Sequence, residues 1–168
     1  MDHFRIRPAE PADLETLVAF SAAMALETEG RTLDQARLRE GTRAVLDASE
    51  NGVYWVAEPD TGPAAIVGQL LITYEWSDWR NATFWWIQSV YVRPDWRRRG
   101  VYRALHRFIS DRARERGDIC GIRLYVESHN TVAQTAYTHV GLRQAAYTVF
   151  EEDFVLPRRS IADSKEVP

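Results

Sequence analysis

Residues 90–105 read VYVRPDWRRRGVYRAL, and their pattern is the best guide to the fold. A β-branched, apolar run ends at Val92, a short loop containing Pro94 follows, and apolar side chains recur at helical spacing from Val101. The pattern predicts a strand, a loop and a helix that begins at Gly100. The free amides of a first helical turn and the positive end of the helix dipole favour an anion at this point.

The residues beside this helix start indicate which anion it binds. Gly100 has no side chain to block a close approach, and it can adopt the left-handed backbone of an anion-binding loop. Arg97, Arg98 and Arg99 add positive charge suited to phosphates. We therefore expect a phosphate-bearing ligand; a solvated basic run beside a glycine is the alternative that the same residues allow.

The rest of the chain alternates between strand and helix patterns. Strands are expected at about 4–7, 53–57, 65–76, 83–92 and 121–126, followed by two short strands or one bent strand in 142–154. Helices are expected at about 14–29, 33–46, 100–116 and 130–139. The polar loop 77–81 predicts an antiparallel hairpin, and the unit 83–126 predicts a right-handed parallel crossover. The fold class is therefore α/β, with a mixed sheet flanked by helices.

Composition limits the classes of function. The 168 residues predict one domain, 1–155, followed by a polar tail, 156–168. A net charge of −3 argues against a nucleic-acid partner. The single cysteine, Cys120, excludes an internal disulfide, and the four histidines lack metal-ligand spacing, so no metal is expected. Without an apolar run of about 20 residues or an apolar signal segment, we expect no membrane association and a cytoplasmic protein.

Two motifs give the chain a family resemblance. Residues 97–102 resemble the coenzyme A pyrophosphate signature of the Gcn5-related N-acetyltransferase (GNAT) superfamily, Gln/Arg-x-x-Gly-x-Gly/Ala. Arg97 and Gly100 match it, whereas Tyr102 departs from the small final residue. Residues 124–142 resemble the second cofactor motif of the family, a strand followed by an Asn-started helix that carries a Tyr and ends at a Gly. The order of elements is similar to that of the family over about residues 3–154.

The resemblance implies a fold and a co-substrate. The fold would be a central mixed, mostly antiparallel sheet with a splayed parallel pair and about four helices. The co-substrate would be acetyl-CoA, without a metal. Its pantetheine arm would pair with the backbone of Val90, Tyr91 and Val92 and with Asn130, which is also a plausible helix N-cap. Its pyrophosphate would lie on the loop and first helical turn, formed by Arg97, Arg98, Arg99, Gly100, Val101, Tyr102 and Arg103.

The resemblance also implies catalytic roles. Tyr137 matches the general acid that protonates the departing thiolate, with helix packing as the alternative. Many members of the family carry a catalytic Glu on the strand equivalent to 83–92, but residues 84–89 hold no carboxylate, and Gln88 cannot take a proton. The preferred candidates for the general base are Glu75 and Glu27. A water chain without a single base is an alternative, and three other acids are further candidates: Asp78, Glu29 and Glu127.

The expected reaction is direct acetyl transfer to an amine, with no covalent enzyme intermediate. Acids and tryptophans near the hairpin favour a small cationic acceptor. The four tryptophans, Trp76, Trp79, Trp85 and Trp86, could instead pack in the core or form a homodimer interface. A protein N-terminus or lysine as acceptor, and a non-catalytic acyl-CoA-binding regulatory module, remain alternatives.

Overall fold

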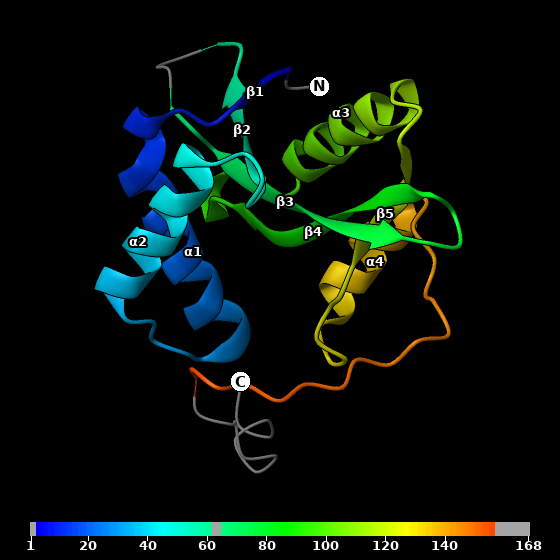
Figure 1. Ribbon diagram of the computed structural model, residues 1–168. Coiled ribbons are helices and arrows are strands. Elements are labelled where there is room, and N and C mark those ends of the chain that lie inside the picture. Colours follow the sequence, from blue (N-terminus) through cyan, green and yellow to red (C-terminus); the bar gives the residue numbers. More distant parts are fainter. Residues whose placement is uncertain (1–2, 62–64, 157–168) are drawn as a thin grey trace.

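The computed structural model describes residues 3–61 and 65–156. In these two ranges, five strands form one sheet in the order β1-β2-β3-β4-β5 (Figure 1). β1 to β4 pair antiparallel, and β4 pairs parallel with β5, so the mixed, mostly antiparallel sheet is confirmed. The strands are β1 (Phe4–Pro8), β2 (Val53–Pro59), β3 (Gly68–Ser77), β4 (Ala82–Val92) and β5 (Ile119–Leu124).

Within the part of the chain that the structure describes, four α-helices accompany the sheet, as expected. They are α1 (Leu14–Glu29), α2 (Gln35–Asp47), α3 (Val101–Glu115) and α4 (Thr131–His139); short 3-10 turns lie at Pro11–Asp13 and Pro94–Trp96. Side chains of β2 alternate between two apolar clusters: Tyr54 and Val56 pack with Leu17 of α1, and Trp55 and Ala57 pack with α3. The helices α1 and α2 therefore cover one face of the sheet, and α3 covers the other.

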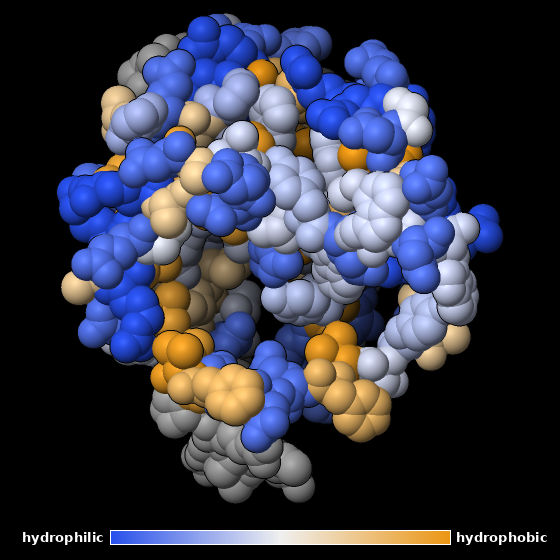
Figure 2. Space-filling model, in the orientation of Figure 1, coloured by the Kyte–Doolittle hydropathy of each residue, from blue (hydrophilic) through white to orange (hydrophobic). Residues whose placement is uncertain are grey.

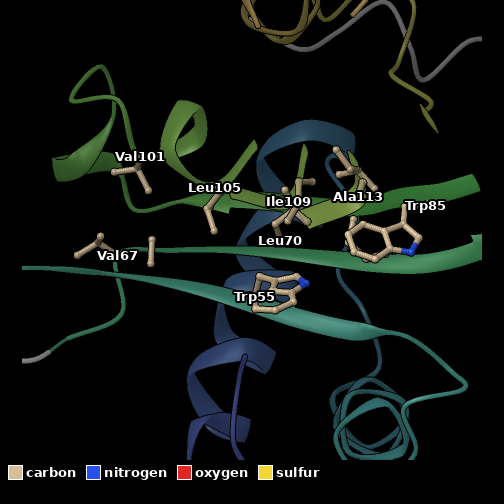
Figure 3. Close-up of a cluster of buried hydrophobic side chains, with 11 residues drawn as sticks. Trp55, Val67, Leu70, Trp85, Val101, Leu105, Ile109 and Ala113 are labelled. Carbon is tan, nitrogen blue, oxygen red and sulfur yellow. The ribbon is translucent and has the colours of Figure 1, made fainter. Parts of the chain in front are cut away.

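The core beneath α3 holds this helix against the sheet. Leu105 and Ile109 are fully buried against Leu70 of β3 (Figure 3). Burying each such side chain contributes about 1.5–3 kcal/mol. Gly68 allows the closest approach, because a Cβ there would lie 2.7 Å from Cγ1 of Val101. The first turn of α3 consequently rests directly on β3.

The parallel pair opens where β5 ends. β5 pairs with β4 from Thr83 to Ile87 and ends at Leu124, so residues 88–92 of β4 have no described strand on that side. The pairing of β3 with β4 also shifts within this region. Leu71 lies opposite Ser89, whereas Ile72 lies opposite Ile87, so Gln88 is the extra residue of a β-bulge. The expected splay begins at this bulge.

The strands expected in 142–154 are absent, and this prediction was wrong. The described part of this segment, which continues to residue 156, has no strand, and it leaves Tyr147 79% and Phe150 94% exposed. Figure 2 shows apolar side chains along the lower edge, where this segment runs in Figure 1. Tyr, Val and Phe favour strands only when a neighbouring strand pairs with them, and none does here.

The start of β3 differs from the prediction, and most of the predicted tail lies outside the described residues. The strand expected from residue 65 begins at Gly68, and residues 62–64 lie outside the described residues. Most of the expected polar tail, 157–168, lies outside them too. Within the described ranges, no helix has both the length and the apolar character needed to cross a membrane.

Candidate active site

The loop before α3 has the backbone geometry of an anion site. Gly100 has φ 90° and ψ 10°, and Arg98 also has a positive φ of 64°, so two left-handed residues curve the loop. The amides from Arg98 to Arg103 donate to no atom of the described residues. A Cβ built on Gly100 would meet nothing within 4 Å. The loop thus presents open space lined by free amides at the positive end of α3.

The opened edge of β4 lies next to this loop in the chain. Val90, Tyr91 and Val92 pair with β3 on one side and have no described strand on the other. The hydroxyl of Ser89 is buried and has no partner among the described residues. Figure 2 shows a hollow between the side formed by α1 and α2 and the side formed by β5 and α4. An extended ligand with amides, such as pantetheine, fits this unpaired edge.

Two of the four arginines predicted to bind phosphate, Arg97 and Arg99, already have partners. Arg97 Nη2 donates to Oε2 of Glu27 at 2.5 Å, and Arg97 Nε donates to the Val92 carbonyl at 3.0 Å. The guanidinium of Arg99 stacks on the ring of Trp96, 4.8 Å from its centroid. Arg98 forms no ion pair or hydrogen bond with the described residues. The structure therefore joins Arg97 to a residue predicted as a base.

Glu27 lies in the last turn of α1 and contacts two residues that were predicted to bind the cofactor, Tyr91 and Arg97. The hydroxyl of Tyr91 donates to Glu27 Oε1 at 2.8 Å. Burial works to raise the pKa of Glu27, but the hydrogen bonds from Arg97 and Tyr91 outweigh it and hold this pKa below its usual value. Glu27 is therefore ionised at neutral pH and is a weak proton acceptor while Arg97 stays bound.

Tyr137, the predicted acid, lies against the start of α3. Its ring packs edge-on against the ring of Tyr102, with 5.5 Å between centroids. Burial raises the pKa of Tyr137, so its phenol holds a proton at neutral pH. The hydroxyl of Tyr102 is buried without a described partner. The residue that departs from the family signature thus packs against the candidate acid.

Asn130 is the N-cap of α4. Its Oδ1 accepts a hydrogen bond from the amide of Ala133 at 3.0 Å. The capping role, which was the alternative to pantetheine binding, is therefore present. It uses the side-chain oxygen and leaves the amide Nδ2 free to donate to a ligand.

Glu75, the other predicted base, belongs to a separate cluster. Arg123 Nη1 of β5 donates to Glu75 Oε1 at 2.7 Å, and Trp86 Nε1 donates to Glu75 Oε2. The guanidinium of Arg123 lies 3.6 Å from the ring centroid of Phe84. No described contact joins Glu75 to Glu27 or to Tyr137. The two predicted bases are each paired with an arginine, and they do not form one acidic cluster.

Gln88 crosses the opening between β4 and β5. Its Nε2 donates to the Thr73 hydroxyl of β3 at 2.8 Å, and its Oε1 accepts from the Tyr125 hydroxyl beyond β5 at 2.9 Å. Gln88 is also the bulge residue. These bonds fix the carboxamide at the splay, where the sequence suggested that it could hold water or substrate.

The hairpin tryptophans do not act as a group. Trp85 is core, 7% exposed, whereas Trp86 lies on the other face, as strand alternation predicts. Trp76 and Trp79 are 63% and 85% exposed at the end of the hairpin. The prediction of core packing therefore holds for Trp85, and Trp76 and Trp79 remain exposed.

Sequence reasoning missed the two arginine partners of the predicted bases. For Arg123 the sequence held no signal, because its place beside Glu75 depends on the register of β5 with Trp86 of β4, which only the structure shows. For Arg97 none existed, because Glu27 lies 70 residues away. No group of three potential metal ligands occurs within residues 3–61 and 65–156.

The model of the acetyltransferase (GNAT) family matches residues 20–142. A possible acetyltransferase from Clostridium difficile 630 is 38% identical, with a TM-score of 0.83, over 91% of this chain and 99% of that chain. No curated protein shows significant sequence similarity to the chain.

More distant solved structures share the fold alone. The aminoglycoside N-acetyltransferase AAC(6')-Iy, solved in complex with CoA, is 14% identical, with a TM-score of 0.72, over 92% of this chain and 97% of its own. The aminoglycoside antibiotic 6'-N-acetyltransferase AAC(6')-Ih from Acinetobacter baumannii is 13% identical, with a TM-score of 0.69, over 91% of this chain and 99% of its own.

Proposed function

Since this chain belongs to the acetyltransferase (GNAT) family, we propose that it transfers an acetyl group from acetyl-CoA to the amine of a small cationic molecule. The observation that carries the proposal is the amide-lined loop at Gly100 beside the unpaired edge of β4. Free amides at a helix start suit a pyrophosphate, and an open strand edge suits the amides of pantetheine.

Different residues would bind the pyrophosphate and the pantetheine arm of acetyl-CoA. The amides from Arg98 to Arg103 would hold the pyrophosphate, with Arg97, Arg98 and Arg99 adding charge. The backbone of Val90–Val92 and the Nδ2 of Asn130 would hold the pantetheine arm. When bound, acetyl-CoA supplies the activated thioester. The free amides from Arg98 to Arg103 and the unpaired edge at Val90–Val92 support this fit.

Two proton transfers are assigned to this chain's own residues. The hydroxyl of Tyr137 would donate to the departing sulfur, which its raised pKa supports by keeping it protonated. Glu27 and Glu75 remain the candidate acceptors of the amine proton. Because each is bonded to an arginine, a water molecule between carboxylate and amine suits them better than direct contact.

A small cationic acceptor is supported by charge around the hollow. Glu27 lies at the carboxyl end of α1, where the helix dipole is negative and the last turn carries no basic residue. Such a position favours a cation and disfavours an anionic acceptor. Two structures with this fold carry the name of aminoglycoside acetyltransferases, which supports small-molecule amines as acceptors.

The test is a turnover screen with acetyl-CoA over a panel of amines, read by release of the free thiol. The panel contains primary monoamines, polyamines, aminoglycosides, zwitterionic and net-negative amines, and a peptide with a free N-terminus. We expect the highest kcat/KM for a net-positive small amine. A net-negative molecule or the peptide as best acceptor would contradict the proposed substrate class, and no turnover with any amine would contradict the activity.

A further inference from the structure

The ion pair between Glu27 and Arg97 connects two parts of the proposed site. Glu27 belongs to α1, on the acceptor side, and Arg97 belongs to the loop proposed for the pyrophosphate. The contact is 2.5 Å long, and the guanidinium also lies 5.5 Å from the ring centroid of Tyr91, whose hydroxyl bonds the same carboxylate. The Glu27–Arg97 ion pair thus joins the proposed acceptor side to the loop proposed for the pyrophosphate.

The bonds of Arg97 leave little of its charge for a phosphate. Its Nη2 faces the carboxylate, and its Nε faces the Val92 carbonyl. A carboxylate at this distance offsets the positive charge of the guanidinium, so less of that charge is available to a phosphate. Both side chains remain partly exposed, 45% for Arg97 and 40% for Glu27, so the pair can open without disturbing the core.

The position of the Glu27 carboxylate favours a neighbouring cation. It lies in the last turn of α1, where the helix dipole places partial negative charge and where no basic residue belongs to the helix. Arg97 is the cation that the Glu27 carboxylate binds in this structure. If Arg97 turned toward a phosphate, Glu27 would lose its partner and would attract another cation.

We propose that Glu27 competes with the phosphates of acetyl-CoA for Arg97, so that cofactor binding frees the Glu27 carboxylate for the cationic amine. Toward acetyl-CoA, Glu27 acts only through Arg97; toward the amine, its freed carboxylate is the partner. This inference rests on the proposed function. Acetyl-CoA and the amine would consequently bind with positive coupling, since each takes one member of the pair.

The sign of one mutational effect tests the inference. Glu27→Gln removes the competing charge and keeps the shape of the side chain. By isothermal titration calorimetry, we expect its Kd for acetyl-CoA to fall about three- to fivefold below that of the wild type, the range that an exposed ion pair can supply. A merely structural role for Glu27 would leave the affinity unchanged or weaken it, and either result overturns the inference.

A double-mutant cycle identifies the route of the effect. In the Arg97→Ala background, Glu27→Gln should give no gain in affinity; an equal gain there would mean that Glu27 acts directly on the phosphates, against the inference. Glu15→Gln is the matched control, because Glu15 lies on the same helix and pairs with Arg39 far from the loop. It should bind acetyl-CoA like the wild type. A wild-type chain that fails to bind acetyl-CoA contradicts the proposed function itself.

Discussion

At the scale of the residue, the predicted acid depends on its neighbour. Tyr102 stands where the family signature has a small residue, and its ring packs edge-on against Tyr137. An aromatic pair of this kind contributes about 0.5–1.5 kcal/mol and restricts the ring. The departure from the signature therefore adds a contact that orients the candidate catalytic phenol.

Tyr137→Phe keeps this ring contact and removes only the hydroxyl. We expect kcat to fall roughly 10²-fold with little change in the Kd for acetyl-CoA, because proton donation is lost and binding is kept. The wild type should also lose kcat at high pH, above the ordinary pKa of a phenol, since burial raises the pKa of Tyr137. Tyr74→Phe, at the far end of β3, serves as control. Wild-type turnover in Tyr137→Phe would assign Tyr137 to packing.

Gly100→Asp tests the anion site directly. A carboxylate there would face the proposed pyrophosphate, so we expect acetyl-CoA affinity to fall at least about tenfold, or ~1.4 kcal/mol, in calorimetric titration. Gly100→Ala separates backbone strain at φ 90° from charge. Gly117→Asp places the same charge beyond the other end of α3 and should leave the affinity intact. Equal affinities for all the folded variants would argue that the cofactor binds elsewhere.

Single residues also mark the limit of sequence reasoning. The chemistry of Gly100 and the three arginines was predicted, because it follows from residue type at a helix start. The partner of each charge was not. Glu27 and Glu75 look like free acids in the sequence, and only the folded sheet shows that each meets an arginine.

At the scale of the element, the position of α3 depends on one glycine of β3. In Gly68→Ala the new Cβ would lie 2.7 Å from Val101 Cγ1 and 3.3 Å from the Tyr91 carbonyl. The first turn of α3 must then move, and overpacking of this kind costs about 1–3 kcal/mol. We expect both a lower free energy of unfolding, measured by urea denaturation, and weaker acetyl-CoA binding.

Gly41→Ala is the control for this change. Gly41 lies within α2, and a Cβ there meets nothing within 4 Å. Replacing a helical glycine by alanine should stabilise the protein by about 0.5–1 kcal/mol. The two substitutions thus have opposite expected signs. A Gly68→Ala variant as stable as the wild type would show that α3 tolerates the displacement.

The elements also show what a sequence pattern can and cannot predict. β4, its loop and α3 were predicted closely, because apolar periodicity, a proline and a glycine act locally. The segment 142–154 has strand-forming residues such as Tyr147 and Val149, yet it forms no strand. Strand formation needs a hydrogen-bonded neighbour, which no local pattern encodes. The bulge at Gln88 was missed for the same reason: it is defined by the register with β3.

At the scale of the whole molecule, a buried charge network links β1, β2 and the entry to α1. Arg7 bonds Asp13 at 2.7 Å and Glu58 at 2.6 Å, and both carboxylates are largely buried. Hydrogen bonds from Arg7 are the main cause that lowers the pKa of Asp13 and of Glu58, against the effect of burial. The network therefore ties folding stability to pH.

The sign of this dependence follows from the lowered pKa values. The stabilisation is complete above the ordinary values of 4.5 for Glu and 3.8 for Asp, and it is lost as the pH falls below them through the folded-state values. Urea denaturation from pH 7 to pH 2 should show the free energy of unfolding falling in this window. Glu58→Gln should cost about 1–3 kcal/mol at pH 7 and flatten the curve. An equally steep curve in Glu58→Gln would exclude the network as its cause.

The separation of Glu27 and Arg97 has a consequence for how the chain matures. The two residues lie 70 positions apart, and β2, β3 and β4 lie between them. Contacts across such long loops form late, because their closure costs entropy that local helices do not pay. The nascent chain therefore exposes Arg97 before its partner can reach it. Until the sheet is assembled, this arginine is open to any polyanion nearby, and the ion pair is acquired only by the finished molecule.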